Sequence, residues 1–526
     1  MSGCRRLTAA VVAFIVTGFV APAAWAAWLD TGTGTGAARA RTLALTGNAP
    51  TVGAAGGDIT VSWAQNTFSS ALLGTYAGGG YRVRRYDTGG TPQTVSGTCN
   101  VAVSGSTSTL SCNEQSVPLG TWRYGVTPVL GAWSGTESTR TQVVVDSPPS
   151  LVALEMKDGN ANGKIDQVVA TFSETLASYS AGTTPWTLAN VPSSGMLSSV
   201  TVDGTTATLT ITEGAGAANT AVGSFTVALA ANANGIRDAG GSQSSFAPTA
   251  PTDKSAPARI ALEMKDVNAN GRIEQVLATF SETLAAYGAG ATPWTLANVP
   301  SSGTLSSVSV SGTTATLTLN EGAGAANTAV GTFTVALTSN AGGIRDAASN
   351  QSSFAATAPT DKAAPIVTAV TLANANGQLA KDDTVTVTFT EALSVASLCP
   401  TWSGDTSNQS LNSNGDVTLT VTDNGSNDLL TVSSGACTLR SGQLALGANY
   451  VTGVNVTFSG NGSNKSTVTW VVSSRTLTFA LGAASAGPLN TGVPASSVTY
   501  SPAAGVTDPA GNGLSTSGVL FSGQRF

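Results

Sequence analysis

The sequence predicts an all-β protein built from several β-sandwich domains in tandem. Its 526 residues are rich in Thr, Ser, Ala and Val and contain 60 glycines, a composition that suits short strands joined by turns. Many short segments alternate apolar and polar residues with a period of two, and none keeps a helical period. A segment about as long as one sandwich also returns later in the chain almost unchanged, which indicates a tandem array.

The N-terminus has the pattern of a secretory signal peptide. Two arginines precede an apolar stretch over residues 7–20, and residues 24–26 (AWA) offer a cleavage site. The apolar stretch is short for a membrane span. We therefore expect a signal peptide at 1–26, an N-terminal extension at 27–47, and no membrane span after cleavage. This predicts a secreted or extracellular protein, including one associated with the cell surface.

Four cysteines remain in the mature chain, and they form two local pairs. Cys99 lies near Cys112, and Cys399 lies near Cys437. An even number in an exported chain favours disulfides over free thiols, with one bridge in each of two domains.

Charge and the missing histidines exclude several classes of function. The formal net charge is −6, so nucleic-acid binding lacks its main electrostatic driver. No histidine is present, which excludes Ser-His-Asp and Cys-His catalysis and zinc sites that need histidine. The sequence therefore predicts a protein that is neither a nucleic-acid binder nor an enzyme.

The internal duplication gives the domain organisation. Asp158 in LVALEMKDGNANGKID corresponds to Asp266 in the second copy, 108 residues later. A third, diverged copy keeps VTVTFTEAL and GVTDPAGN. We predict domains at 48–147, 148–256, 257–365 and 366–526, the last with an inserted hairpin or long loop.

The strand pattern predicts which side chains face the core. Val152, Leu154 and Met156 alternate with polar or small residues and are expected to point inward together. SVTVDGTTATLTIT reads as a hairpin with Asp203-Gly204 at its turn.

The segments ITVSWAQ, GYRVRRYD and GTWRYGVTPVLGAWSGTES make the domain at 48–147 resemble a fibronectin type III domain. The three following domains resemble bacterial Ig-like repeats of secreted and surface proteins, in which a D-x-N-x-N-G-x-x-D loop leads into a V-x-V-x-F-S-E strand. The resemblance implies tandem immunoglobulin-like and fibronectin III-like β-sandwiches. It also implies roles in spacing, display and adhesion, although fold analogy alone does not establish a function.

Two Asn-rich loops are candidate calcium sites. Oxygen donors at the first, third, fifth and ninth positions, with glycine at the sixth, match the front of a calcium-binding loop. The predicted ligands are Asp158, Asn160, Asn162, Lys164 and Asp166 in the first loop, and Asp266, Asn268, Asn270, Arg272 and Glu274 in the second; Lys164 and Arg272 would bind through their backbone carbonyls. The usual glutamate at the twelfth position is missing, so Glu155 or Glu174 would have to supply it. The alternative is a hydrogen-bonded Asx turn without metal.

Aspartates near the domain ends have two interpretations. Asp238, Asp346 and Asp508 precede Gly- or Asn-containing turns, where Asp commonly caps the backbone. The alternative is a calcium site at the domain junction that also uses Asp253 or Asp361. An ion there would stiffen the array.

Other candidates have structural explanations. Glu174 and Asp166 could be paired as glycosidase carboxylates, but both recur in ordinary strand and loop positions. Trp186 and Trp294 could stack on sugars if exposed, although sandwich tryptophans commonly fill the core. Trp402, beside Cys399, is equally ambiguous.

The sequence as a whole predicts a non-catalytic secreted or cell-surface structural or adhesion protein, with calcium as its one suggested cofactor. Its partner would be a surface or matrix ligand, either protein or carbohydrate. The alternative is a carbohydrate-binding or enzyme-accessory protein, which would need exposed aromatic side chains.

Overall fold

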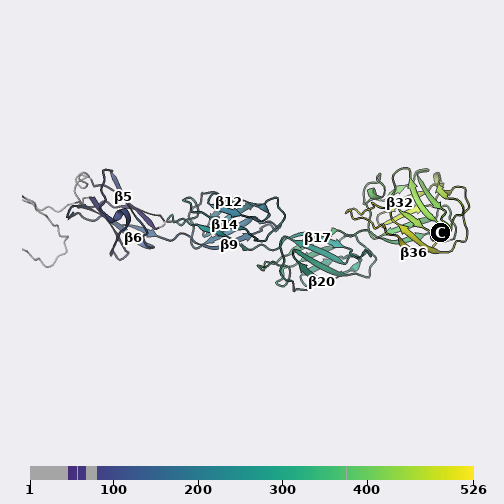
Figure 1. The fold of residues 1–526 in the computed structure, drawn as a ribbon, viewed down its shortest axis with the longest axis horizontal. Helices are drawn as coiled ribbons and strands as arrows, with labels where there is room; N and C mark the ends of the chain where they lie inside the picture. Colours follow the sequence, from purple (N-terminus) through teal and green to yellow (C-terminus); the bar gives the residue numbers. More distant parts are fainter. Residues whose placement is uncertain (1–44, 56, 67–79, 375) are drawn as a thin grey trace, which may run out of the picture.

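The computed structural model describes residues 45–526 except 56, 67–79 and 375. The predicted signal peptide and most of the N-terminal extension lie outside the described residues. Figure 1 shows four β-rich units that follow one another along the chain. The described helices are single turns, namely α2 (Val395–Leu398), η1 (Gly97–Asn100), η2 (Pro192–Ser194), η3 (Pro300–Ser302) and η4 (Gly462–Asn464). The predicted all-β class is confirmed.

The first sandwich contains two antiparallel sheets. The smaller sheet has the order β1-β2-β5, with β1 (Thr51–Ala55), β2 (Asp58–Ala64) and β5 (Thr109–Glu114). The larger has the order β4-β3-β6-β7, with β8 also paired to β6; its strands are β3 (Gly80–Tyr86), β4 (Pro92–Gln93), β6 (Gly120–Leu130), β7 (Trp133–Ser134) and β8 (Thr141–Val145). Trp63, Tyr81 and Tyr124 fill the space between the sheets.

The second sandwich combines a five-stranded and a three-stranded sheet, in the orders β12-β13-β10-β9-β16 and β11-β14-β15. Its strands are β9 (Leu151–Lys157), β10 (Gln167–Phe172), β11 (Trp186–Ala189), β12 (Met196–Asp203), β13 (Thr206–Thr212), β14 (Thr226–Leu229), β15 (Phe246–Thr249) and β16 (Thr252–Asp253). The short strand β16 lies in the Pro-containing linker and pairs in parallel with β9. The linker is therefore fixed to the sandwich that precedes it.

The third sandwich repeats this topology, with the orders β20-β21-β18-β17-β24 and β19-β22-β23. Its strands are β17 (Arg259–Lys265), β18 (Gln275–Phe280), β19 (Trp294–Ala297), β20 (Thr304–Ser311), β21 (Thr314–Asn320), β22 (Thr334–Leu337), β23 (Phe354–Thr357) and β24 (Thr360–Asp361). Strand β24 again pairs in parallel with the first strand, β17.

One prediction about the core faces is wrong at Val152. Leu154 and Met156 are buried as expected, but Val152 is 66% exposed. The register between β9 and β10 shifts there, because Leu151 pairs with Phe172 while Ala153 pairs with Thr171. Val152 is the extra residue of a β-bulge, and a bulge of one residue reverses the alternation on its far side.

The fourth sandwich is larger. Its five-stranded sheet has the order β25-β26-β33-β32-β27, and its seven-stranded sheet has the order β34-β31-β28-β29-β30-β35-β36. The strands are β25 (Val367–Leu372), β26 (Thr384–Phe389), β27 (Gln409–Leu411), β28 (Val417–Thr422), β29 (Leu429–Ser434), β30 (Gln443–Ala445), β31 (Val456–Ser459), β32 (Thr467–Val471), β33 (Thr476–Ala480), β34 (Ala483–Ala484), β35 (Ser496–Ser501) and β36 (Val519–Gln524). Because β26 pairs with β33, the extra strands β27–β32 are inserted between two neighbouring strands of one sheet.

Both predicted disulfides are present. Cys99 is bonded to Cys112 in the first sandwich, and Cys399 to Cys437 in the fourth. Each bridge joins residues within one sandwich, so neither links one sandwich to the next.

Candidate metal centres at the junctions between sandwiches

Three carboxylates meet where each linker reaches the next sandwich. At the second junction these are Asp253 from β16, Glu282 just after β18, and Asp346 from a later loop of the third sandwich. One oxygen from each lies within 4.8 Å of the others. The same arrangement recurs at the first junction with Asp146, Glu174 and Asp238, and at the third with Asp361, Glu391 and Asp508. We call these three groups the junction clusters.

The chain positions the loop aspartates of the clusters by local hydrogen bonds. Asp346 caps its own turn, since its Oδ1 accepts the backbone N–H of Asn350 at 2.8 Å. The Asn350 side-chain amide donates to Asp346 Oδ2 at 2.7 Å and to the Asp253 carbonyl at 3.1 Å. In the fourth sandwich the backbone N–H of Asn512 donates to Asp508 Oδ1, and its side-chain amide donates to Asp508 Oδ2 and to the Asp361 carbonyl. The capping role predicted for these aspartates is present, and it places the same carboxylates in the junction clusters.

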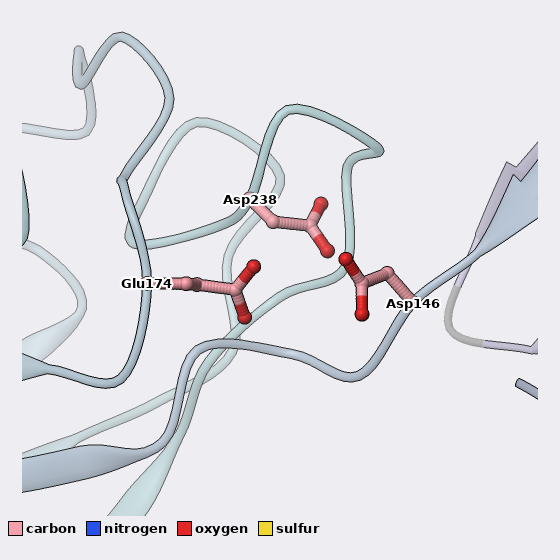
Figure 2. Close-up of side chains that lie close together, drawn as sticks. All are labelled: Asp146, Glu174 and Asp238. Carbon is pink, nitrogen blue, oxygen red and sulfur yellow. The ribbon is translucent and has the colours of Figure 1, made fainter. Parts of the chain in front are cut away.

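The first junction cluster contains a buried oxygen that lacks a donor. Asp238 is 3% exposed, and its Oδ1 accepts the Ser242 backbone N–H at 2.8 Å. Its Oδ2 has no hydrogen-bond partner. Figure 2 shows the carboxyl groups of Asp146, Glu174 and Asp238 turned toward one another. An unsatisfied buried polar group costs about 1–3 kcal/mol, and more when it is charged, so a cation bound at this position would stabilise the folded junction.

The electrostatics of the clusters also favour a cation. Burial raises the pKa of Asp253 to about 6 and that of Glu282 to about 7, and neighbouring carboxylates add to both shifts. Burial likewise raises the pKa of Asp361 to about 6 and that of Glu391 to about 8. The ion pairs found among the described residues involve other carboxylates. Several hard oxygens gathered without a countercharge suit a divalent cation such as calcium.

The preceding sandwich closes the second and third clusters with a threonine. Thr220 of the second sandwich donates its hydroxyl to Glu282 Oε1 at 2.6 Å, and its oxygen lies 2.7 Å from Ser281 Oγ. Thr328 of the third sandwich donates its hydroxyl to Glu391 Oε1 at 2.5 Å, and its oxygen lies 2.7 Å from Thr390 Oγ1. Both threonines are fully buried. Sequence reasoning missed them, although GAGAANT, which ends in this threonine, occurs in both copies.

The Asn-rich loops satisfy their oxygens with their own backbone. Asp158 accepts the backbone N–H groups of Asn162 at 3.3 Å and Gly163 at 2.8 Å, while Asp166 accepts that of Gly159 at 3.0 Å. In the second copy the Asp266 carboxylate accepts hydrogen bonds from the backbone N–H groups of Asn270 and Gly271. The Glu274 carboxylate accepts them from those of Val267 and Asn268. These bonds are those of the Asx turns predicted as the alternative. Calcium binding by Asp158, Asp266 and their neighbours stays a prediction.

A carboxylate that the sequence did not suggest lies against each Asn-rich loop. Glu213 accepts the side-chain amides of Asn160 and Asn162 at 2.8 Å, and Glu321 does the same for Asn268 and Asn270. The nominated Glu155 forms a half-exposed ion pair with Lys157 at 3.4 Å instead. The side chains of Lys164 and Arg272 donate to the carbonyls of Gly214 and Gly322.

Each Asn-rich loop touches the next sandwich. Gly163 has φ +90°, and a Cβ placed on it would lie 3.3 Å from the Ser281 Cβ and 3.5 Å from the Ala258 Cβ. Gly271 has φ +86°, and a Cβ placed on it would lie 2.7 Å from the Thr390 Cγ2 of the fourth sandwich. The glycine therefore allows both the left-handed turn and the close approach. These loops belong to the contact between sandwiches.

The proposed glycosidase pair is separated by a whole strand. Asp166 precedes β10 and Glu174 follows it, so about six residues at roughly 3.3 Å each place them about 20 Å apart. Glycosidase carboxylates lie roughly 5–9.5 Å apart. Glu174 instead meets Asp146 and Asp238, which excludes the nominated pair as a joint catalytic site.

The nominated tryptophans lie in the cores. Trp186 and Trp294 are each 6% exposed, as is Trp402. Trp186 contacts Phe246, and Trp294 contacts Phe354, edge to face at 5.9 Å. Their rings are not available as sugar-stacking platforms, which favours the structural interpretation over the carbohydrate-binding alternative.

No protein-family model matches the sequence, and the comparison with curated proteins also gives no match. Among solved structures, the chain is similar to the FN1–FN3 domains of chicken CNTN1, with 9% identity and a TM-score of 0.19 over 59% of this chain and 96% of the other. It is also similar to a segment of titin, with 11% identity and a TM-score of 0.17 over 61% and 96%. A third similarity is to SGBP-B of Bacteroides ovatus, solved with a mixed-linkage heptasaccharide, with 13% identity and a TM-score of 0.14 over 80% and 89%.

These TM-scores are too low to support a functional assignment. Within residues 45–526, apart from the gaps given above, no helix has the length and apolar character of a membrane crossing.

Proposed function

We propose that this chain is a non-catalytic structural or adhesion protein, secreted or displayed at the cell surface, whose sandwiches are held in line by calcium at the junction clusters. The observation that carries the proposal is the recurrence of three carboxylates at all three junctions, with at least one from each side. A single ion bound by such a set joins the linker of one sandwich to the loops of the next. Removing the ion leaves like charges facing one another, which favours separation of the two sides.

The cluster chemistry fits calcium better than softer metals. Calcium is bound by six to eight oxygens, which include carboxylates, carbonyls and water. The Asp253 carboxylate, Glu282 and Asp346 are all hard oxygen donors, and the chain contains no histidine. Soft thiolate ligands are also missing from the clusters, because the four mature cysteines form disulfides.

The extracellular location rests on the predicted signal peptide and on the two disulfides, since disulfides persist in oxidising compartments. In this role the repeats supply reach, and a surface or matrix ligand would be bound on loops, which commonly carry function in rigid scaffolds.

Thermal unfolding of the mature protein, with calcium and with excess chelator, tests the proposal. A ligand that binds only the folded state stabilises it, by about 2.7 kcal/mol at a hundredfold excess over Kd. We expect calcium to raise the apparent melting temperature and to narrow the distribution of end-to-end lengths in small-angle scattering. A variant with Glu174→Gln, Glu282→Gln and Glu391→Gln should lose both effects.

A second variant, Asp158→Ala with Asp266→Ala, is the control because it removes carboxylates of the Asn-rich loops and none of the carboxylates of the junction clusters. Loss of the calcium effect in this variant alone would assign the ion to the loops and contradict the junction proposal. No calcium effect on the unaltered protein at millimolar concentration would contradict both.

The contact made by Gly163 gives a separate prediction. Gly163→Ala should weaken the second junction, because the added Cβ meets the third sandwich and an L-residue with positive φ costs about 1–2 kcal/mol. Gly204→Ala is the matched control, since Gly204 also has positive φ but has no atom within 4 Å of its added Cβ. Limited proteolysis of the linker near Lys254 should accelerate only in Gly163→Ala. Equal acceleration in both variants would show that strain, rather than the junction contact, is responsible.

A further inference from the structure

The three junction clusters differ in how completely they are enclosed. At the second and third junctions, the preceding sandwich holds the glutamate through Thr220 or Thr328. At the first junction, Glu174 has no hydrogen bond to a threonine within the described part of the chain, and Asp146 is exposed. The first sandwich has different strand orders from the second and third, and it supplies only its linker aspartate, Asp146, to the cluster.

The threonine hydroxyl holds one of the two carboxylate oxygens of the glutamate. Because Thr220 bonds to Oε1 of Glu282 and is itself fully buried, the glutamate is held in one place while its other oxygen stays free for a ligand. The closely packed Gly163 and Ser281 cover the same region. An ion on that oxygen would be enclosed between the two sandwiches, so its release requires the sandwiches to separate there, which breaks the threonine bond between them.

A second difference lies in the turn that holds the aspartate. Asn350 bridges Asp346 to the Asp253 carbonyl at 3.1 Å, and Asn512 bridges Asp508 to the Asp361 carbonyl at 3.3 Å. The first junction has Ser242 in this place, whose hydroxyl donates to the Asp146 carbonyl at 3.4 Å while Asp238 Oδ2 has no hydrogen-bond partner. The amide bridge that links the aspartate side chain to the linker at the other two junctions is therefore missing at the first.

We infer that Thr220 and Thr328 are positioning residues that divide the junctions into two closed calcium sites with slow release and one open site with fast release. The inference rests on the proposed function, namely that the clusters bind calcium. It adds that the joint between the first and second sandwiches responds first when calcium falls, while the two later joints stay closed.

Stopped-flow release of calcium into excess Quin-2 tests the division on the full mature chain. We expect two phases, with about one third of the calcium in the fast phase and the rest released roughly tenfold more slowly, since a hydrogen bond to a charged group must break first. Glu174→Gln should remove the fast phase only. Thr220→Val with Thr328→Val should convert the slow phase into a fast one, while the conservative pair Thr220→Ser with Thr328→Ser should keep it slow.

Each other outcome is decisive. A single phase in the unaltered protein, or a slow phase that persists in the valine variant, would overturn the division of the sites. Loss of the fast phase in the valine variant, or of the slow phase in Glu174→Gln, would show that the phases are assigned to the wrong junctions and would also overturn it. If the unaltered protein releases no calcium, the proposed function itself fails. A single release phase instead means that calcium binds at three equivalent sites, so only the division into closed and open sites fails.

Discussion

Replacing Glu114 with alanine is expected to destabilise the first sandwich by about 3–5 kcal/mol, because it leaves a buried guanidinium unpaired. Glu114 is 1% exposed. It accepts Arg85 Nη1 at 2.6 Å, the Tyr124 hydroxyl at 2.7 Å and the Ser96 backbone N–H at 3.2 Å. Three donors lose their acceptor at once. Scanning calorimetry should show one transition lowered by about 12 °C or more.

Glu155→Ala is the matched control for this change. Glu155 pairs with Lys157 at the surface of the second sandwich, and exposed pairs of this kind contribute about 0–1 kcal/mol. A loss of less than about 1 kcal/mol in Glu114→Ala would mean that Arg85 escapes to solvent once its partner is removed, and that the network is not a requirement of the fold.

In the presence of chelator, the stability of the third and fourth sandwiches is expected to fall as pH rises from about 5 to 8. The folded pKa of Glu282 is about 7 and that of Glu391 about 8, against 4.5 for the free side chain. The folded state therefore binds more protons over this interval, so the stabilising contribution is present below about pH 4.5 and is lost as pH rises through the folded pKa. The expected loss is about 3 kcal/mol per junction, at about 1.4 kcal/mol per pKa unit.

Urea unfolding at pH 5 and pH 8 measures this effect, with chelator in one series and calcium in the other. Glu282→Gln with Glu391→Gln should flatten the dependence on pH, because glutamine does not titrate, and calcium should restore stability at pH 8. The prediction is wrong if, in chelator, the stability of the unaltered protein depends on pH as little as that of the glutamine variant. The clusters would then be hydrated and open without metal.

Much of the fold could be predicted from the sequence. Period-two strands, the 108-residue duplication and the local cysteine pairs depend on neighbours along the chain, so they are visible in a single sequence. The bulge at Val152 was missed because it is a property of the pairing with β10: its extra residue is defined only when Leu151 and Ala153 are opposite Phe172 and Thr171.

The candidate site was predicted in part. The sequence suggested a junction site for Asp238, Asp346 and Asp508 with the linker aspartates Asp253 and Asp361. Glu174 was named for other roles, since nothing local shows that the end of β10 meets a linker from another sandwich. Asp146 was missed because its linker, DSPPS, lacks the lysine and spacing of DKSAP. Thr220 was missed because its partner, Glu282, lies 62 residues away in the next sandwich.

The placement of these groups has a consequence for how such a chain can change its length. On the side that faces the preceding sandwich each repeat carries the Glu and Asp acceptors, and on the side that faces the next sandwich it carries the threonine, the Asn-rich loop and the linker aspartate. The end of one repeat therefore fits the start of any other, including a copy of itself. A gene that gains or loses one 108-residue unit keeps the three carboxylates at each junction, so reach can vary between descendants without a new kind of contact having to arise.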